Sequence, residues 1–543
     1  MRDLRWCIPA GLGVGVVLAL LSGGTFRQAQ DGAWWGGWLA YSALLVPGLW
    51  MLAALWRWAG GGRRLAVIVA VALILRLACG VALTLLLPSF GNDNPEQNAG
   101  YLFYDAFKRD TQAWDLASSD RPITKAFRGR IFTSDQYGGL LASSALVYRY
   151  LSPDYHRQVL VILLGALVAA MGIPLLWRAA VEMTPLQPTS PPSPLPEGEG
   201  RRGEGGLALA AAWILAVYPE SVLQGSAQMR EPFLITFTAC MLWGFLAIRR
   251  LHLPSGWAWL GGGLLGLILF SPGMALANLV ILGGWLLIEG GKRRVSWLLG
   301  GGLVVVFVLA LLSLSANWAQ AAPGRGTLDV IVRWVQATLH WNIYSLDQSS
   351  GMVQYLFRSM PPGLRLPFIA GYGVLQPVLP SALIEPTIPL WRIVGTLRAA
   401  GWYALLPLLV YGVIAAFKTD DPAQRRLWLW LVATVWVWIL ISALRGGGDQ
   451  WDNPRYRAIL LPWQALVAGY AWVFWLGARD RWLPRILVLE LIFLSTFTIW
   501  YAGRYYSLPV LNFWQYVVIV LLAGGGLLVA DVLREQRGRP DKR

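Results

Sequence analysis

Apolar runs long enough to cross a membrane recur along almost the whole chain. Of its 543 residues, 56% are hydrophobic and 14% are charged, whereas a soluble domain carries about 25% charge. Fourteen runs have about 16–23 residues, close to the ~20 that a helix needs to cross the hydrocarbon core. The predicted spans are 6–22, 34–56, 65–87, 158–180, 207–222, 231–249, 256–271, 273–289, 295–315, 400–417, 427–444, 457–477, 485–501 and 513–532. The sequence therefore predicts an all-α, polytopic membrane protein.

Arginine and lysine gather on one side of the predicted spans. The loops and termini on that side hold 24 of the 45 basic residues, whereas the short loops on the other side hold six. Because basic loops stay in the cytoplasm, we expect a cytoplasmic (inner) membrane protein with both termini inside and long outer loops at 88–157 and 316–399. The same asymmetry accounts for the net charge of +16, so nucleic acid is not an expected partner.

Two segments between the spans need separate treatment. Segment 137–151 is apolar but has only about fifteen residues, which is short for a crossing. If it crossed, every later basic cluster would move outside, so we predict a juxtamembrane helix on the outer surface. Residues 184–206 begin with five prolines in eleven positions and predict a disordered cytoplasmic linker.

The polar interval 88–136 is the first candidate for chemistry. It gathers more ionisable groups than any other stretch, and a carboxylate needs water or a cavity because hydrocarbon does not support its charge. Its acidic residues are Asp93, Glu96, Asp105, Asp110, Asp115, Asp120 and Asp135. Asp93 and Glu96 are candidate ligands for Mg²⁺ or Mn²⁺, which prefer oxygen ligands.

Asp105 and Asp110 lie five residues apart within this interval. On a helix, that spacing separates the two side chains by about 140° around the axis, so they cannot share a face. We therefore expect different roles for them. One could act as a base in a membrane cavity, while the other caps a helix, pairs with Arg109 or helps to bind a metal.

A second polar segment, 445–457, offers cations for an anionic substrate. It combines Arg445, Arg455 and Arg457 with three consecutive glycines. The guanidinium fork suits phosphate oxygens, and glycine lets a backbone approach closely. The alternative is ordinary loop charge with Asp449 and Asp452 as partners. Arg76 is expected to snorkel or pair with an acid inside its span, or to contact phosphate, and His340 is a substrate-contact candidate in the second outer loop.

Several motifs resemble polytopic glycosyltransferases of the GT-C fold. The closest are the dolichyl-phosphate-mannose–protein mannosyltransferase and aminoarabinose transferase group. The resemblance covers mainly 65–250, and it rests on a short helix, an acidic outer loop with Asp110-Thr-Gln-Ala-Trp114, and a short apolar segment. Tyr218-Pro-Glu-Ser and Arg230-Glu231-Pro232 resemble that group's Pro…Ser…Glu pattern. Two departures are Trp114, where the family has Tyr, and the two helices that precede residue 65.

This resemblance implies a domain organisation. Residues 1–64 would be two extra helices and 65–315 a GT-C-like module with the catalytic loop 88–157. Segment 316–399 would be a second outer loop, followed by C-terminal helices in 400–543.

The resemblance also implies a reaction. A sugar would pass, with inversion, from a polyprenyl-phosphate donor to a glycan, lipid or protein acceptor on the outer face. Asp110, or Asp105 as the second choice, would be the general base. Glu231 and Trp114 would contact substrate, and the arginines of 445–457 would meet the charge of the leaving phosphate.

Two other functions stay open. A flippase for lipid-linked glycans would place acids and arginines at mid-membrane in broken helices with internal repeats, and the sequence offers only Arg76 and no repeat. A non-catalytic subunit of an envelope complex would tolerate neutral replacements throughout 88–136.

The topology can be tested by cysteine labelling from outside the cell. The three natural cysteines lie within apolar runs, so single cysteines introduced at Asp120, Ser350 or Leu195 report their own positions. We expect labelling at 120 and 350 and none at 195. Labelling at 195 without labelling at 350 would contradict the orientation.

Overall fold

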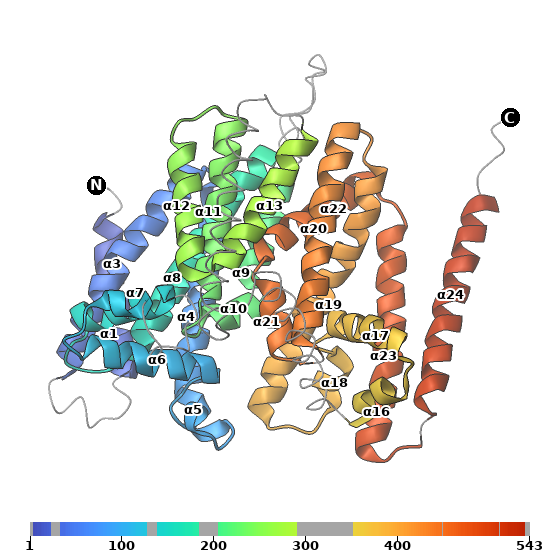
Figure 1. The fold of residues 1–543 in the computed structure, drawn as a ribbon, viewed down its shortest axis with the longest axis horizontal. Helices are drawn as coiled ribbons and strands as arrows, with labels where there is room; N and C mark the ends of the chain where they lie inside the picture. Colours follow the sequence, from blue (N-terminus) through green and yellow to red (C-terminus); the bar gives the residue numbers. More distant parts are fainter. Residues whose placement is uncertain are drawn as a thin grey trace, which may run out of the picture. The chain divides into compact units, whose positions relative to one another are not determined.

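The computed structural model describes residues 4–22, 33–127, 138–183, 205–289, 351–447, 449–509 and 511–537 (Figure 1). These residues form helices and no strand. Four sequence predictions concern residues outside the described parts: the span 295–315, His340, Asp135 and nearly all of the linker 184–206. The described residues fall into two compact units, one comprising residues up to 289 with 457–469, the other 351–456 with 470–537.

The first unit combines long membrane helices with a layer of short helices. The apolar helices, which include the bent pair α9–α10, are α1 (Leu4–Ser22), α3 (Ala33–Ala59), α4 (Gly62–Phe90), α8 (Gln158–Met183), α9 (Gly206–Val217), α10 (Pro219–Gly225), α11 (Glu231–Arg249), α12 (Gly256–Phe270) and α13 (Pro272–Ile288). Between α4 and α8 lie the short helices α5 (Pro95–Asn98), α6 (Tyr104–Ala117), η1 (Ile123–Phe127) and α7 (Gly139–Leu151). The described part of the polar interval, up to residue 127, is therefore largely helical rather than an open loop.

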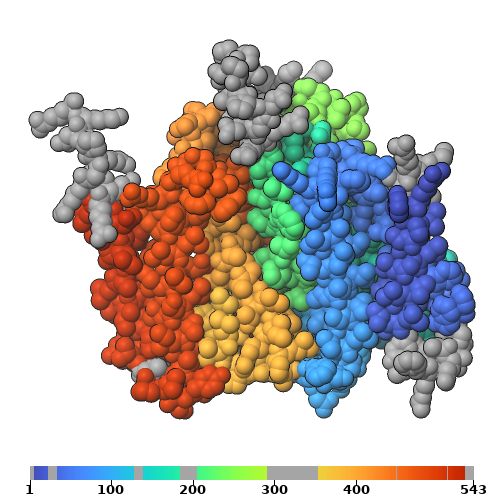
Figure 2. Space-filling view, turned by 180° about the vertical axis from the view of Figure 1, so that it is seen from behind, coloured from blue at the N-terminus to red at the C-terminus, as the bar shows by residue number. Residues whose placement is uncertain are grey.

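Helix α8 forms the centre of the first unit. Helices α3, α4, α9 and α11 all pack against it. The membrane-crossing windows of α8 and α11 are 83% and 89% buried within the protein, compared with 39% for α4. An inner helix needs apolar residues around its whole circumference, whereas α4 turns one face outward (Figure 2).

Arg76 stabilises the break between α9 and α10. Pro219 has no N–H for the carbonyl of Leu215, and the two helices bend by 54° at this point. The buried guanidinium of Arg76 donates to the carbonyl oxygens of Leu215 (2.9 Å) and Ala216 (2.8 Å), and to Ser221 Oγ (2.9 Å). Arg76 was expected to snorkel, to pair with an acid or to contact phosphate. Its guanidinium instead donates to backbone carbonyls, which need donors inside a membrane.

Residues 457–469 join the first unit through a buried polar bridge. Trp463 Nε1 donates to Asn278 Oδ1 at 2.8 Å, and Asn278 Nδ2 donates to Thr238 Oγ1 at 3.1 Å. All three side chains are buried. The bridge links the start of α22 (Leu461–Ala478) to α11 and α13, although 185 residues separate Asn278 from Trp463.

The second unit is also helical. Its elements are α16 (Gly351–Ser359), α17 (Pro362–Leu375), α18 (Leu379–Ile384), α19 (Pro389–Lys418), α20 (Pro422–Gly446), α21 (Asp452–Ala458, to Tyr456), α22 (Leu461–Ala478, from Tyr470), α23 (Trp482–Tyr506) and α24 (Phe513–Arg537). The described part of the predicted outer loop 316–399 is therefore largely helical, and α19 begins eleven residues before the predicted span at 400.

The membrane character of the chain is confirmed, and the number of spans is lower in the described residues than the fourteen predicted. Eight helices there are long and apolar enough to cross, or ten if the bent pairs α9–α10 and α21–α22 each count as one. The predicted spans 6–22, 256–271 and 273–289 correspond to shorter apolar helices. Helix α7 has only 13 residues and is not among the helices that could cross.

Loss of the Arg76 side chain should destabilise the first unit. Arg76→Leu leaves two buried carbonyls at the Pro219 break without donors, and an unmade buried hydrogen bond costs about 1–3 kcal/mol. We expect a clearly lower thermal unfolding temperature of the purified protein. Arg64→Leu, an exposed arginine at the start of the same helix, is the control. Equal unfolding temperatures for the two variants would contradict this role.

Candidate functional site

Helix α6 places one carboxylate on a buried face. Its buried residues are Ala106, Arg109, Asp110, Ala113 and Leu116, a spacing of three or four that forms one stripe. This stripe packs mainly against α7. Asp110 lies in the middle of the stripe, where neighbouring elements enclose it completely.

Asp110 accepts hydrogen bonds from three side chains. The hydroxyl of Tyr148 on α7 donates to Oδ1 at 2.5 Å, and the hydroxyl of Tyr101 donates to Oδ2. His156 Nε2 lies 2.8 Å from Oδ2, and Asp110 is 0% exposed. Trp114 completes this group, which we call the Asp110 cluster: Tyr101, Asp110, Trp114, Tyr148 and His156.

The two tyrosines are fixed as donors. Burial, followed by the adjacent Asp110 carboxylate, raises the pKa of Tyr101 and the pKa of Tyr148 well above the ordinary tyrosine value. Both hydroxyls therefore keep their protons over the physiological pH range.

His156 is the part of the cluster that reaches the surface. Its side chain is 31% exposed, compared with 0% for Asp110. Trp114 stacks on the imidazole, with ring centroids 5.1 Å apart and an interplanar angle of 25°, and Tyr148 meets it edge-on at 5.0 Å. Two aromatic rings thus fix the plane of an imidazole that Asp110 anchors at one nitrogen.

Two arginines hold the supporting elements together. Arg149 on α7 donates to the carbonyl oxygens of Leu116, Ala117, Ser119 and Arg121. These carbonyls lie at and just beyond the C-terminal end of α6, where a cation is favourable.

Arg157, next to His156, has its own set of partners. It forms a two-pronged ion pair with Asp154 at 2.7 and 2.8 Å, and it also donates to Ser152 Oγ. This pairing lowers the pKa of Asp154. Residues 152–157 are thereby fixed as a compact corner that presents His156 to α6.

Asp105 and Asp110 lie in different environments on α6, as their five-residue spacing predicted. Asp105 lies in the first turn of α6, its side chain is 45% exposed, and it pairs with Arg109 at 3.4 Å. Asp110 is the enclosed member of the pair. The two residues therefore occupy different environments, and the Asp110 cluster does not include Asp105.

The predicted metal ligands offer an incomplete donor set. Exposed Asp93 accepts a hydrogen bond from Asn98 Nδ2 at 2.9 Å, and Glu96 lies in the first turn of α5. Among the residues that the structure describes, no group of three His, Cys, Asp or Glu side chains could hold a metal ion. We derive no step through a metal at this position.

The arginines of 445–457 have neighbours within their own segment. Arg445 lies over the ring of Tyr456 at 4.6 Å, and buried Arg455 lies 3.8 Å from Asp452. These four residues belong to the second unit, whereas the fully buried Arg457 belongs to the first. Residues 452–457 of the expected loop lie in the short helix α21, and residues 445–446 are the end of α20.

Glu231 and Trp114 were predicted as substrate contacts. Glu231 is fully buried at the start of α11, and Glu220, Gln224 and Arg230 are also buried in this part of the chain. Trp114 is half-buried and covers His156 with one face. The structure thus places Trp114 against His156, within the Asp110 cluster.

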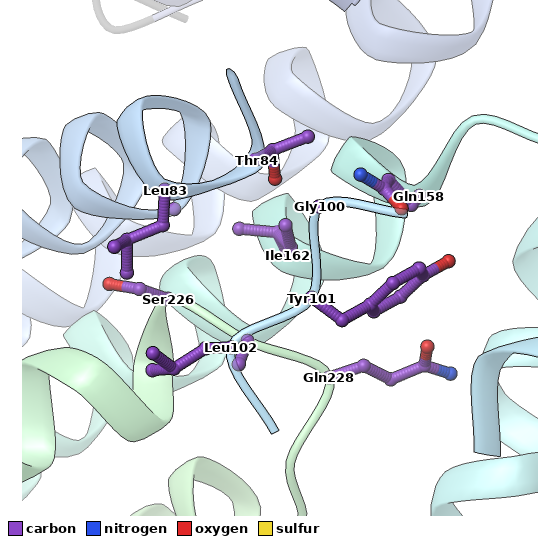
Figure 3. Close-up of a pocket in the computed structure, with 11 residues that line it drawn as sticks. Leu83, Thr84, Gly100, Tyr101, Leu102, Gln158, Ile162, Ser226 and Gln228 are labelled. Carbon is purple, nitrogen blue, oxygen red and sulfur yellow. The ribbon is translucent and has the colours of Figure 1, made fainter. Parts of the chain in front are cut away.

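Two cavities in the first unit differ in what they can hold. The cavity beside Tyr101 has a volume of ≈ 10 Å³ and is lined by residues including Gly100, Gln158, Ser226 and Gln228 (Figure 3). Figure 3 shows the Tyr101 ring and the Gln228 side chain extending to the same side of it. That volume suits a single water and excludes a sugar.

The second cavity is an apolar groove of ≈ 760 Å³ along α1, α3 and α4. On α4 it extends from Ala66 to Leu85, about 28 Å of helix. No charged residue lines it. A prenyl chain matches these walls, as do the acyl chains of bilayer lipids.

Sequence reasoning missed most of the residues that surround Asp110. Tyr101, Tyr148 and His156 were not among the candidate site residues. Their contacts with Asp110 join positions 9, 38 and 46 residues away. The only local signal was the polar character of Tyr148-Arg-Tyr-Leu-Ser-Pro-Asp-Tyr-His156-Arg157 directly after an apolar helix.

Comparison with protein-family models, with curated proteins and with solved structures gives no match to this chain.

Proposed function

We propose that this chain is a membrane glycosyltransferase that moves a sugar from a polyprenyl-phosphate carrier to an acceptor hydroxyl. The observation that carries the proposal is the Asp110 cluster, a fully enclosed carboxylate bonded to a half-exposed imidazole. A carboxylate–imidazole pair of this kind can take a proton from a hydroxyl near neutral pH. The motif around Asp110 and Trp114 adds the resemblance to GT-C enzymes.

In the proposed reaction, the acceptor oxygen bonds to the anomeric carbon as the bond to the phosphate oxygen breaks. The hydroxyl proton passes to the Asp110–His156 pair, and the polyprenyl phosphate leaves with the bonding electrons. A single displacement of this kind inverts the anomeric configuration. The charge asymmetry of the loops favours an outer-face reaction, with both termini in the cytoplasm.

The leaving phosphate needs positive charge as its own charge develops. Arg445, Arg455 and Arg457 are the candidates, since a guanidinium can meet two phosphate oxygens at once. Arg455 and Arg457 are buried, so a phosphate reaches them only if their present neighbours move aside. The apolar groove along α1, α3 and α4 is compatible with a prenyl carrier.

Transport of a lipid-linked glycan is the second candidate function. Transporters place polar residues in broken helices at mid-membrane. The described residues contain two bent helix pairs, α9–α10 at 54° and α21–α22 at 75°, and Glu220, Arg230 and Glu231 are buried near the first. A fluorescent prenyl-phosphate analogue that the purified protein moves across liposomes without releasing sugar would support this reading.

The transferase proposal depends most directly on Asp110. We expect Asp110→Asn to lower sugar transfer by about 10²–10⁴-fold, or ~3–5 kcal/mol of barrier, because the amide cannot support proton transfer. Asp105→Asn, at an exposed acid one turn away, should lose far less, since a surface ion pair contributes under ~1 kcal/mol. The assay is release of polyprenyl phosphate from a labelled donor by purified protein.

Folding and donor binding serve as controls for both variants. Activity retained in Asp110→Asn but lost in Asp105→Asn would move the catalytic role to Asp105. Activity retained in both would remove α6 from the chemistry and favour transport.

The arginine segment is tested separately. Arg455→Ala and Arg457→Ala should raise the donor KM more than the corresponding Lys variants do, because only arginine offers a planar fork. Arg426→Ala, at an exposed position near the start of α20, is the control. Normal turnover in the double Ala variant, with expression intact, would exclude this segment from the site.

A further inference from the structure

The geometry points to His156, rather than Asp110, as the group that takes the acceptor proton. In this inference, which rests on the proposed transferase function, Asp110 is a positioning residue. It holds the imidazole in one tautomer and stabilises the positive charge that develops on it.

Asp110 and His156 differ in how easily an acceptor hydroxyl can reach them. A general base must come within hydrogen-bond reach of the proton that it takes. Asp110 is 0% exposed, with Oδ1 bonded to Tyr148 and Oδ2 bonded to Tyr101 and His156. An acceptor hydroxyl could reach either oxygen only by displacing one of these donors. The His156 side chain is 31% exposed, so a hydroxyl can approach it directly.

The hydrogen bonds also select the tautomer. Both tyrosines keep their protons and donate them to Asp110, so the carboxylate acts only as an acceptor in this cluster. His156 must therefore carry its proton on Nε2, the nitrogen that faces Asp110 Oδ2. In the neutral imidazole this leaves the lone pair on Nδ1. No residue in the described parts of the chain bonds to Nδ1.

The surroundings stabilise the protonated product. When Nδ1 takes a proton, the imidazolium lies 2.8 Å from the Asp110 carboxylate and stacks on Trp114. An indole face attracts a cation. This arrangement gives Trp114 a definite role: it holds the ring in place and favours its charged form.

His156 has described contacts with titratable side chains on two helices. They are Asp110 on α6 and Tyr148 on α7, and Tyr101 is linked to it through Asp110. The next residue, Arg157, forms an ion pair with Asp154 and donates to Ser152.

The step balances within the named groups. The acceptor hydroxyl gives its proton to Nδ1 as its oxygen bonds to the anomeric carbon, and the carbon–oxygen bond to the lipid phosphate breaks. Nδ1 later returns the proton to water. Asp110 keeps its hydrogen bond to Nε2 throughout and does not become protonated.

Nuclear magnetic resonance of histidine-labelled protein tests the tautomer without any substrate. The chain has three histidines, and the signal missing from His156→Gln identifies His156. In liposomes above its titration midpoint, we expect ¹⁵N shifts of an imidazole protonated at Nε2 and free at Nδ1. In Asp110→Asn a larger share of the imidazole should carry its proton on Nδ1, because Nε2 loses its carboxylate acceptor. A proton on Nδ1 in the wild-type protein, or the same tautomer ratio in Asp110→Asn, would overturn the inference.

Kinetics separate this inference from the proposed function. We expect His156→Ala to lower kcat at least 100-fold with little change in donor KM, and added imidazole to restore part of the turnover. His252→Asn is the control, because His252 is exposed and has a left-handed backbone (φ 53°) that asparagine tolerates.

The kinetic outcomes distinguish failure of this inference from failure of the proposed function. If Asp110→Asn abolishes transfer while His156→Ala stays within about threefold of the natural enzyme, Asp110 is itself the base, and only the inference fails. If folded wild-type protein releases no polyprenyl phosphate from any donor tested, the proposed function fails, and the tautomer measurement still decides the pairing of His156 with Asp110.

Discussion

The enclosed carboxylate of Asp110 is the constraint on which this part of the structure depends. A carboxylate removed from water is costly unless donors replace its hydration. Here three donors come from three separate segments: Tyr101 before α6, Tyr148 on α7 and His156 after it. Satisfying one side chain therefore fixes the positions of all three segments. Arg149, bonded to the carbonyls at the end of α6, reinforces the same arrangement from the other side.

The sequence predicted what depends on local pattern and missed what depends on contact. Apolar runs predicted nearly every long helix in the described residues, and the five-residue spacing separated Asp105 from Asp110 correctly. Helical periodicity says nothing about partners 38 or 46 residues away, so Tyr148 and His156 had no signal of their own. The partners of Arg76 were not predicted for the same reason, because the carbonyls of Leu215 and Ala216 lie about 140 residues along the chain.

Helix α3 belongs to the scaffold of the candidate site. Gly36 and Gly37, near its start, lie against the 152–157 corner. A Cβ at Gly36 would come within 2.9 Å of Asp154 Oδ2, and one at Gly37 within 3.1 Å of Arg157 Nε. Larger residues would push on the ion pair that fixes the corner, and with it His156. Helix α3, which precedes the part of the chain that resembles a GT-C module, thus helps to position His156.

The broken helix α9–α10 carries less weight for transport once Arg76 is considered. A break in a membrane helix exposes carbonyls, and a transporter can use such carbonyls to bind an ion. At this break the carbonyls of Leu215 and Ala216 already have a donor in the Arg76 guanidinium, which also bonds Ser221. The break is thus satisfied within the protein. In the Asp110 cluster, by contrast, the network ends at a half-exposed imidazole with one nitrogen free of described partners. Of these two polar networks, the second therefore includes a partly exposed side chain, whereas the break at Pro219 is closed by buried groups.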